Sequence, residues 1–340
     1  MIGMLGLTEE CGSIGDLLTG EKVHQAMERL TSIVHRTPLV TSETTNSIVN
    51  KQVYFKMENQ QKTGAFKFRG ASFKLMQLSK QELEKGIITA SAGNHAQGLA
   101  FAAKKLGAKS MIYMPEKTPI SKVEATKNYG AEVVLVGASF QEAYEASMKR
   151  QLKTGAVYVH PFDDYDIMAG QGTIAMEMLR QEDRIDTFLV PIGGGGLISG
   201  IAVAAKYVNR NIRIIGVQAS NSCAMYRDYH HNKVIGPQSP TIAEGIDVKN
   251  PGQFTLPIIR DYVDDIITVS DEEIAAAVLY MLERNKALVE GAGAAALAAL
   301  FKHNKSIKSR HCGIVVSGGN MDISTIPKIQ RLADNEHITA

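Results

Sequence analysis

Cysteine is scarce in this chain, and so is any excess of charge of one sign. The three cysteines, Cys11, Cys223 and Cys312, are far apart and show no C-x-x-C spacing, which argues against a disulfide framework and favours a reducing compartment. Lysine and arginine number 37 against 35 aspartates and glutamates, a net charge of +2. So small a charge offers little attraction for nucleic acid or for an anionic membrane surface. We therefore expect a small-molecule ligand, no nucleic acid and no membrane.

An export signal and an uninterrupted membrane-length segment are also missing. The first residues include Glu9, Glu10 and Asp16, where a secretory signal needs a basic start and an unbroken apolar region. The longest uncharged stretch, residues 187–205, contains Pro191 and five glycines, so it predicts a strand, a turn and a helix. We expect a cytoplasmic protein.

The length and the order of sequence patterns indicate an α/β fold. The 340 residues, 44% of them hydrophobic and 21% charged, suit two domains or one large unit with an inserted lobe. Short β-branched runs alternate with helical patterns, which predicts a parallel sheet. The expected strands are residues 53–57, 86–90, 110–114, 132–136, 156–159, 187–191, 212–217 and 313–317. A capping box at Ser270 predicts a helix that buries Ile274, Val278 and Leu282.

Lys67 lies at the start of a predicted helix, within the segment KTGAFKFRG at residues 62–70. A cation is disfavoured at the positive end of a helix dipole, so we expect the pKa of Lys67 to lie below the ordinary lysine value. A lysine that is neutral can attack a carbonyl carbon. Taken alone, however, a solvated lysine without a role is the simpler interpretation of this segment.

Residues 91–98, SAGNHAQG, follow a predicted strand and lead into a helix. Small residues at such a turn expose backbone N–H groups, and the positive helix end beside them favours an anion. A carboxylate suits this turn, because Ser91 and Asn94 place polar side chains beside the free amides. A purely structural helix start explains the segment about as well.

A run of glycines, Gly193, Gly194, Gly195 and Gly196, precedes Leu197 at the start of another predicted helix. Such a run has a high conformational entropy cost, whereas a phosphate wrapped by main-chain amides requires the absence of Cβ atoms. Ser317 likewise follows the last predicted strand. Open α/β sheets bind ligands at the carboxyl ends of their strands, so we expect these clusters to form one pocket. An amine, a phosphate site, a carboxylate site and a hydroxyl are what a pyridoxal phosphate enzyme for amino acids needs.

Six motifs occur in one order along the chain: TGAFKFRGA, SAGNHAQG, GQGTIAMEML, PIGGGGLISGIAVA, EGAGAAALAAL and VSGGNMD. They resemble those of the fold-type II pyridoxal phosphate enzymes, and most closely those of the threonine dehydratases, also called threonine ammonia-lyases. The resemblance implies two open, twisted, mostly parallel sheets flanked by helices, as in the tryptophan synthase β subunit. It also implies a large domain of residues 1–78 and 164–340, a small domain of residues 79–163, and no C-terminal regulatory domain.

The resemblance further implies roles for the motif residues. Lys67 would be the Schiff-base lysine and the base that takes the α-proton, with Phe66 against the ring of pyridoxal 5'-phosphate. Asn94 would bond the 3-oxygen of the ring and Ser317 would face its nitrogen, while the amides from Gly193 to Leu197 would hold the phosphate. Ser91, Gly93 and His95 would receive the substrate carboxylate. The implied reaction converts the β-hydroxy amino acid L-threonine to 2-oxobutanoate and ammonia, and L-serine to pyruvate.

Two alternatives of different kinds stay open. Serine racemases share the scaffold, but they resemble S-S-G-N-H where this chain has Ala92, which has no proton to give from the second face. A non-enzymatic nucleotide-binding or regulatory protein is suggested by GAGAAA at residues 291–296, although no strand pattern precedes this run. We expect no metal, because His230 and His231 are adjacent and Gln218 and Ala224 replace acidic ligands of the animal racemases. A homodimer or homotetramer is expected, and a nucleoside monophosphate effector is left open.

Overall fold

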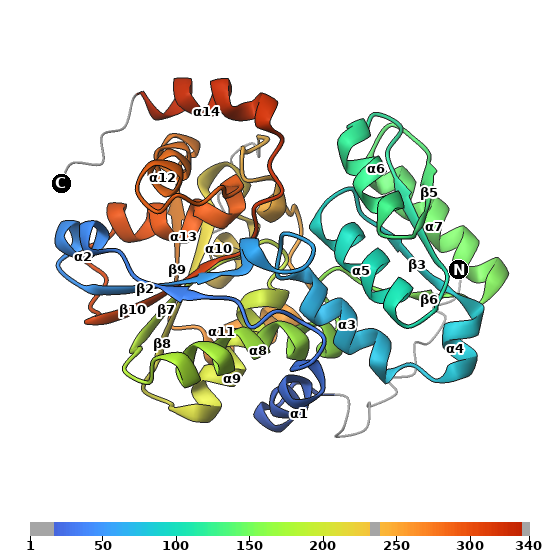
Figure 1. Cartoon of the computed structure of the whole chain (residues 1–340), viewed down its shortest axis with the longest axis horizontal. Coiled ribbons are helices and arrows are strands. Elements are labelled where there is room, and N and C mark those ends of the chain that lie inside the picture. The colour runs from blue at the N-terminus through green and yellow to red at the C-terminus, as the bar shows by residue number, and fades with distance from the viewer. Residues whose placement is uncertain (1–16, 232–238, 335–340) are drawn as a thin grey trace, which may run out of the picture.

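Two mainly parallel sheets organise the computed structural model, which describes residues 17–231 and 239–334 (Figure 1). The larger sheet is parallel except for its edge strand β1, which runs antiparallel to β2. Its strands, in spatial order, are β1 (Leu39–Val40), β2 (Gln52–Met57), β10 (His311–Val316), β7 (Thr187–Pro191), β8 (Arg213–Ala219) and β9 (Asp265–Val269). The smaller sheet is wholly parallel. Its strands, in order, are β5 (Glu132–Leu135), β4 (Ser110–Met114), β3 (Ile87–Ala90) and β6 (Val157–Tyr158).

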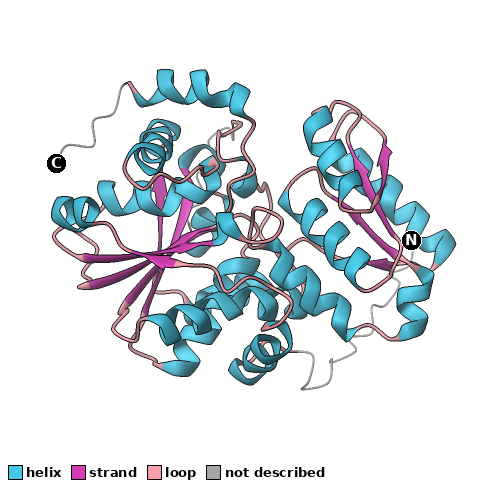
Figure 2. Ribbon diagram, viewed as in Figure 1, coloured by secondary structure: helices cyan, strands magenta, loops and turns pink. Residues whose placement is uncertain are grey.

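Helices surround both sheets, as Figure 2 shows. The first half of the described chain contains α1 (Gly20–Leu30), α2 (Glu43–Val49), α3 (Lys67–Gln77), α4 (Lys80–Lys85), α5 (Asn94–Lys105), α6 (Ile120–Asn128) and α7 (Phe140–Thr154). The second half contains α8 (Tyr165–Gln181), α9 (Gly196–Val208), α10 (Ala224–Tyr229), α11 (Thr255–Tyr262), α12 (Asp271–Glu283), α13 (Gly291–Lys302) and α14 (Ile326–Ala333). No helix within the described ranges is both long and apolar enough to span a bilayer.

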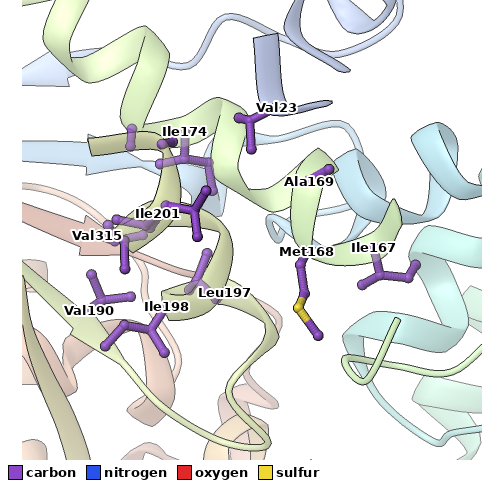
Figure 3. Close-up of a cluster of buried hydrophobic side chains, with 14 of the residues drawn as sticks. Val23, Ile167, Met168, Ala169, Ile174, Val190, Leu197, Ile198, Ile201 and Val315 are labelled. Atoms are coloured by element: carbon purple, nitrogen blue, oxygen red, sulfur yellow. The ribbon is translucent and has the colours of Figure 1, made fainter. Parts of the chain in front are cut away.

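The core of the molecule lies on both faces of the larger sheet. Side chains alternate between the two faces of a strand, and β7 shows this clearly. Phe188 and Val190 pack in a cluster with α8 and α9, part of which is drawn in Figure 3, whereas Leu189 packs on the other side with α12 and α13. Both faces of β7 are therefore buried from solvent, which explains why every residue after Thr187 in this strand is apolar.

Glycines let α3, α8 and α9 pack backbone against backbone. A Cβ atom at Gly170 of α8 would come within 2.6 Å of the Cα of Gly70 in α3. Two residues further along α8, on the opposite side of the helix, a Cβ at Gly172 would come within 2.6 Å of the carbonyl oxygen of Gly200 in α9. Because Lys67 begins α3 and the glycine run begins α9, this packing fixes the separation of the two predicted site segments.

A buried cluster of charges lies behind α3. The guanidinium of Arg69, which is 0% exposed, donates at 2.8 Å to both carboxylate oxygens of Glu58 and at 2.7 Å to Glu177. Lys56, also fully buried, donates to the other oxygen of Glu177 at 2.6 Å. Two cations and two anions thus satisfy each other within the core, and one of them, Arg69, lies two residues after Lys67 in α3.

Each of the eight strands expected from the sequence is present, and the helix that begins at Ser270 has the expected capping box. Two strands were not predicted, the two-residue edge strand β1 and β9. The expectation that Leu282 is buried was wrong, because this side chain is 38% exposed at the end of α12, where the helix has turned its last residues toward solvent.

Candidate active site

A cavity of about 750 Å³ lies at the carboxyl ends of β3, β7 and β10. The site residues expected from the sequence all line it: Phe66, Lys67, Ser91, Gly93, Asn94, His95, Gly193, Gly194, Gly195, Gly196, Leu197 and Ser317. Segments separated by more than two hundred residues of sequence therefore meet in one space. The prediction that the four clusters form one pocket is confirmed. The roles of the individual residues stay predictions.

Four helices, α3, α5, α9 and α13, begin at the wall of this cavity, and none has its first amides capped by a side chain at its N-cap position. Six other helices of the described chain, α1, α2, α4, α7, α8 and α12, do have such a cap; Asp164, for example, accepts from two amides of α8. Uncapped amides and the positive ends of helix dipoles favour anions. The cavity is therefore suited to a ligand with more than one negative group.

The glycine run forms a cradle that side chains would fill. Gly195 has a φ of 100°, in the left-handed region that favours glycine. A Cβ atom at Gly194 would overlap the ring of Phe162, and one at Gly196 would come within 2.7 Å of the carbonyl oxygen of Phe162. The hydroxyl of Thr255 donates to the carbonyl oxygen of Gly194 at 2.7 Å and fixes the loop from the other side. The amides of this loop can therefore wrap a phosphate.

Asp163, which the sequence did not single out, supports that cradle. Its carboxylate accepts from the backbone N–H groups of Gln253, Phe254 and Thr255 at 2.8 to 3.1 Å, at the start of α11. Thr255 in turn contacts Gly194. The partners of Asp163 lie about ninety residues away, so no local pattern signals this role.

Lys67 lies on the wall of the cavity with its amine turned inward. Its Nζ atom donates to the carbonyl oxygen of Pro161 at 2.7 Å and lies 5.3 Å from the centre of the Phe66 ring. Burial lowers the pKa of Lys67 to about 8, although the nearby carboxylate of Glu290 acts in the opposite direction. The lowered pKa expected from the sequence is confirmed, with desolvation rather than the helix dipole as its main cause.

The loop at the start of α5 presents amides to the cavity, and His95 contributes through its main chain. Burial lowers the pKa of His95 to about 3, so the ring is neutral at physiological pH. Its Nε2 atom lies 3.2 Å from the carbonyl oxygen of Val159 and therefore carries the proton. The Nδ1 atom has no partner among the described residues and can only accept. A substrate carboxylate can thus be bound by the backbone N–H of His95 but not by its ring.

The family model for pyridoxal-phosphate dependent enzymes matches residues 30–318 of this chain. The chain belongs to this family. It is 49% identical over 305 residues to an L-threonine ammonia-lyase of Geobacter sulfurreducens, covering 89% of this chain and 76% of the relative. It is 44% identical over 314 residues to an L-threonine ammonia-lyase of Thermotoga maritima, covering 92% of this chain and 78% of that relative. The structure of maize serine racemase is similar with a TM-score of 0.87 and 38% identity, covering 94% of this chain and 99% of that one.

The cavity residues of this pyridoxal-phosphate dependent enzyme fit the cofactor. The cradle at Gly194 and Gly196 has free amides and no room for side chains, as a phosphate requires. Lys67 supplies a desolvated amine for the aldehyde of the cofactor. Ser317 is 3% exposed at the end of β10 and lines the same cavity. Its carbonyl oxygen accepts from the N–H of Phe66 at 3.1 Å, which ties β10 to the segment before Lys67.

Glu290 is the second residue that the sequence did not single out. Its carboxylate accepts from the side-chain amide of Asn94 at 2.7 Å. Burial raises the pKa of Glu290 to about 7, against the effect of the hydrogen bond from Asn94. The available signal is an acidic residue directly before an uncharged, helical run, within the motif EGAGAAALAAL, for which the resemblance implies no role of Glu290.

The nucleotide-binding alternative loses its basis in this structure. Residues 291–296 begin helix α13 and follow a loop rather than a strand, as the sequence indicated. A Cβ atom at Gly291 would come within 2.6 Å of the carbonyl oxygen of Ile242, so close packing accounts for the small residues.

The side chain of Gln218, which stands where the animal racemases have an acidic metal ligand, is buried and bonds the backbone of Ile192 and Tyr226. Within residues 17–231 and 239–334 no group of three His, Cys, Asp or Glu residues could hold a metal ion.

Proposed function

We propose that this chain is a pyridoxal 5'-phosphate-dependent L-threonine ammonia-lyase, which converts L-threonine to 2-oxobutanoate and ammonia and L-serine to pyruvate. The observation that carries the proposal is the amine of Lys67 in a cavity with two uncapped helix starts, one after the glycine run and one after Gly93. Relatives named L-threonine ammonia-lyase at 44% and 49% identity support the same activity.

The residues of the cavity divide the ligand between them. The amides from Gly193 to Leu197 would hold the cofactor phosphate, and those of Gly93 and His95, with Ser91, would hold the substrate carboxylate. Phe66 would lie against the ring of the cofactor, Asn94 would bond its 3-oxygen, and Ser317 would face its nitrogen. When bound, the cofactor supplies delocalisation of the negative charge that forms at the α-carbon.

Lys67 moves the proton. Its Nζ atom takes the proton from the α-carbon, and a pKa of about 8 leaves a useful fraction of the amine neutral near physiological pH. The carbonyl oxygen of Pro161, 2.7 Å from Nζ, holds the amine when it is not engaged with the ligand. Because Ser317 carries no negative charge, it does not enforce a protonated ring nitrogen. Elimination of the β-hydroxyl is therefore favoured over transamination.

Racemisation is the second candidate, since the fold is shared with serine racemases. Ala92 lines the cavity where a racemase has a second serine, and its methyl group cannot protonate the opposite face of the α-carbon. One-sided proton chemistry favours elimination over inversion.

Incubation of the pure protein with L-threonine tests this assignment. We expect 2-oxobutanoate and ammonia in equal amounts, and pyruvate when L-serine replaces threonine. Chiral chromatography of the serine reaction is expected to show at least about tenfold less D-serine than pyruvate. D-serine as the main product would instead identify a racemase, and no keto acid from either amino acid would reject the lyase.

The rate at which the cofactor-free protein takes up pyridoxal phosphate is expected to rise with pH and to level off at about 8. Lys67 attacks only as a free amine, so protonation below its pKa of about 8 lowers the rate about tenfold per pH unit. Absorbance after rapid mixing measures the rate, with N-acetyl-lysine as the reference amine. A rise that continues toward the ordinary lysine value of 10.5 would contradict a desolvated Lys67.

We further propose a large domain of residues 1–78 and 164–340, a small domain of residues 79–163, a cytoplasmic location, and a homodimer or homotetramer. The four-stranded sheet, whose strands all lie between Ile87 and Tyr158, supports the division into domains.

A further inference from the structure

A chain of hydrogen bonds at the cavity wall holds both polar atoms of the Asn94 amide. Nδ2 of Asn94 donates to Oε1 of Glu290 at 2.7 Å. Oδ1 of Asn94 accepts from Nδ2 of Asn320 at 2.8 Å, and the same amide nitrogen of Asn320 donates to the carbonyl oxygen of Thr63 at 2.8 Å. The chain connects the starts of α13 and α5 with the loops after β10 and before α3.

This arrangement allows only one orientation of the Asn94 amide. Thr63 offers a carbonyl oxygen, so Asn320 must turn its NH₂ group toward Thr63 and Asn94. Asn94 must then accept with Oδ1 and donate with Nδ2 toward Glu290. Nδ2 carries two hydrogens, and Glu290 uses one of them. Since Asn94 lines the cavity, the second N–H is available to a ligand there.

Glu290 occupies the N-cap position of α13, yet its side chain caps no amide of that helix. The carboxylate is instead turned toward Asn94. Two glycines leave space for the arrangement, because a Cβ at Gly318 would lie 2.7 Å from Oε1 of Glu290 and one at Gly64 would overlap Asn320. Capping of α13 therefore does not explain an acidic residue at this position.

We propose that Glu290 is a positioning residue that acts through Asn94: Glu290 and Asn320 together fix the Asn94 amide so that its second N–H points at the bound cofactor. The inference rests on the proposed function, in which Asn94 bonds the 3-oxygen of the cofactor ring. It adds a carboxylate and a second amide that both bond the side chain of Asn94.

The charge of Glu290 makes this positioning dependent on pH. Burial raises the pKa of Glu290 to about 7, and the negative charge of Glu244 acts in the same direction. The hydrogen bond from Asn94, the positive charge of Lys122 and the backbone N–H of Asn320 act to lower this pKa. Lys67 is also near Glu290, and the charge of the Glu290 carboxylate raises the pKa of Lys67. Above pH 7 the ionised carboxylate accepts strongly from Asn94; below it the neutral acid accepts weakly.

Three variants test the proposal in the cofactor-loaded protein: Glu290→Gln, Asn320→Ala and, as a charge-matched control, Asp247→Asn. Asp247 is exposed and lines the same cavity, and within the described residues its carboxylate makes no hydrogen bond or ion pair. Two quantities are measured between about pH 6 and pH 9: the visible absorption of the bound cofactor and the dissociation constant for pyridoxal phosphate. Circular dichroism confirms that each variant is folded.

We expect the wild-type absorption to change with a midpoint near pH 7, and Asp247→Asn to behave like it. Glu290→Gln is expected to lose this transition and, at pH 8, to bind pyridoxal phosphate about tenfold more weakly, because a charge-assisted hydrogen bond becomes a neutral one. Asn320→Ala is expected to weaken binding by a similar factor while it keeps the transition, because Glu290 is still present.

The outcomes separate this inference from the proposed function. A wild-type protein that takes up no cofactor would overturn both. If the wild-type protein binds cofactor, the inference alone fails when Glu290→Gln keeps the pH transition or binds as tightly as wild type. It also fails if Asn320→Ala leaves the dissociation constant unchanged, since the Asn94 amide would then not need its second support.

Discussion

Lys67→Ala is expected to lower the formation of 2-oxobutanoate from L-threonine by at least about 1000-fold. The substitution removes both the amine that joins the cofactor and the base that takes the α-proton, while the cradle at Gly194 and Gly195 is left intact. The measurement is the rate of keto acid formation at saturating threonine. The variant should still fold, because within the described residues the side chain of Lys67 makes a single hydrogen bond, to the carbonyl oxygen of Pro161.

Lys62→Ala provides the matched control for this variant. Lys62 lies five residues earlier in the same segment, and its amine donates to the carbonyl oxygen of Ile33, outside the cavity. Its loss is expected to leave the rate within about twofold of wild type. Comparable losses in the two variants would show that the segment matters only for folding. Borohydride reduction of the holoenzyme adds a chemical check, since the label is expected at position 67.

Arg69→Met is expected to lower the free energy of unfolding by about 3–5 kcal/mol. Arg69 is fully buried and donates to both Glu58 and Glu177, so its removal leaves carboxylates in the core without sufficient partners. Denaturant or thermal unfolding of the cofactor-free protein measures the change. A decrease in the free energy of unfolding of less than about 1 kcal/mol would mean that water reaches this cluster of charges.

The double variant with Arg69→Met and Glu58→Leu serves as the control. It removes the cation together with Glu58, one of its two carboxylate partners, while Lys56 still pairs with the other, Glu177, at 2.6 Å. We expect it to recover at least half of the stability lost in Arg69→Met, because an apolar pair avoids the unpaired buried charge. No recovery would show that the packing of Arg69, and not its charge, is what matters.

The sequence predicted the elements with strong local patterns and missed those that depend on distant partners. β7 and α9 were expected because a run of apolar residues, four glycines and a second apolar run can hardly form anything else. β9 was not predicted because its run, DIITV, begins with an aspartate and directly follows another, and because its pairing with β8 is decided by tertiary packing. β1 has two residues and exists only through its partner, β2.

The same distinction applies to the candidate site. The glycine run and Lys67 carry their chemistry in a local pattern, so their convergence could be predicted. Asp163 and Glu290 act on residues that are about ninety and two hundred positions away. Each is an ordinary acidic residue in its own sequence surroundings, and only the folded chain shows that one steadies the glycine loop and the other holds Asn94.

The glycine contacts between α3, α8 and α9 also affect how the protein opens. Where backbones meet directly, no side chain can change rotamer to absorb a small displacement, so one helix cannot loosen while its neighbours stay in place. These helices, which carry the amine and the phosphate loop at their ends, should therefore exchange their amide hydrogens as one cooperative unit. Thermal fluctuation would then disturb the distance between amine and phosphate only when the whole unit separates.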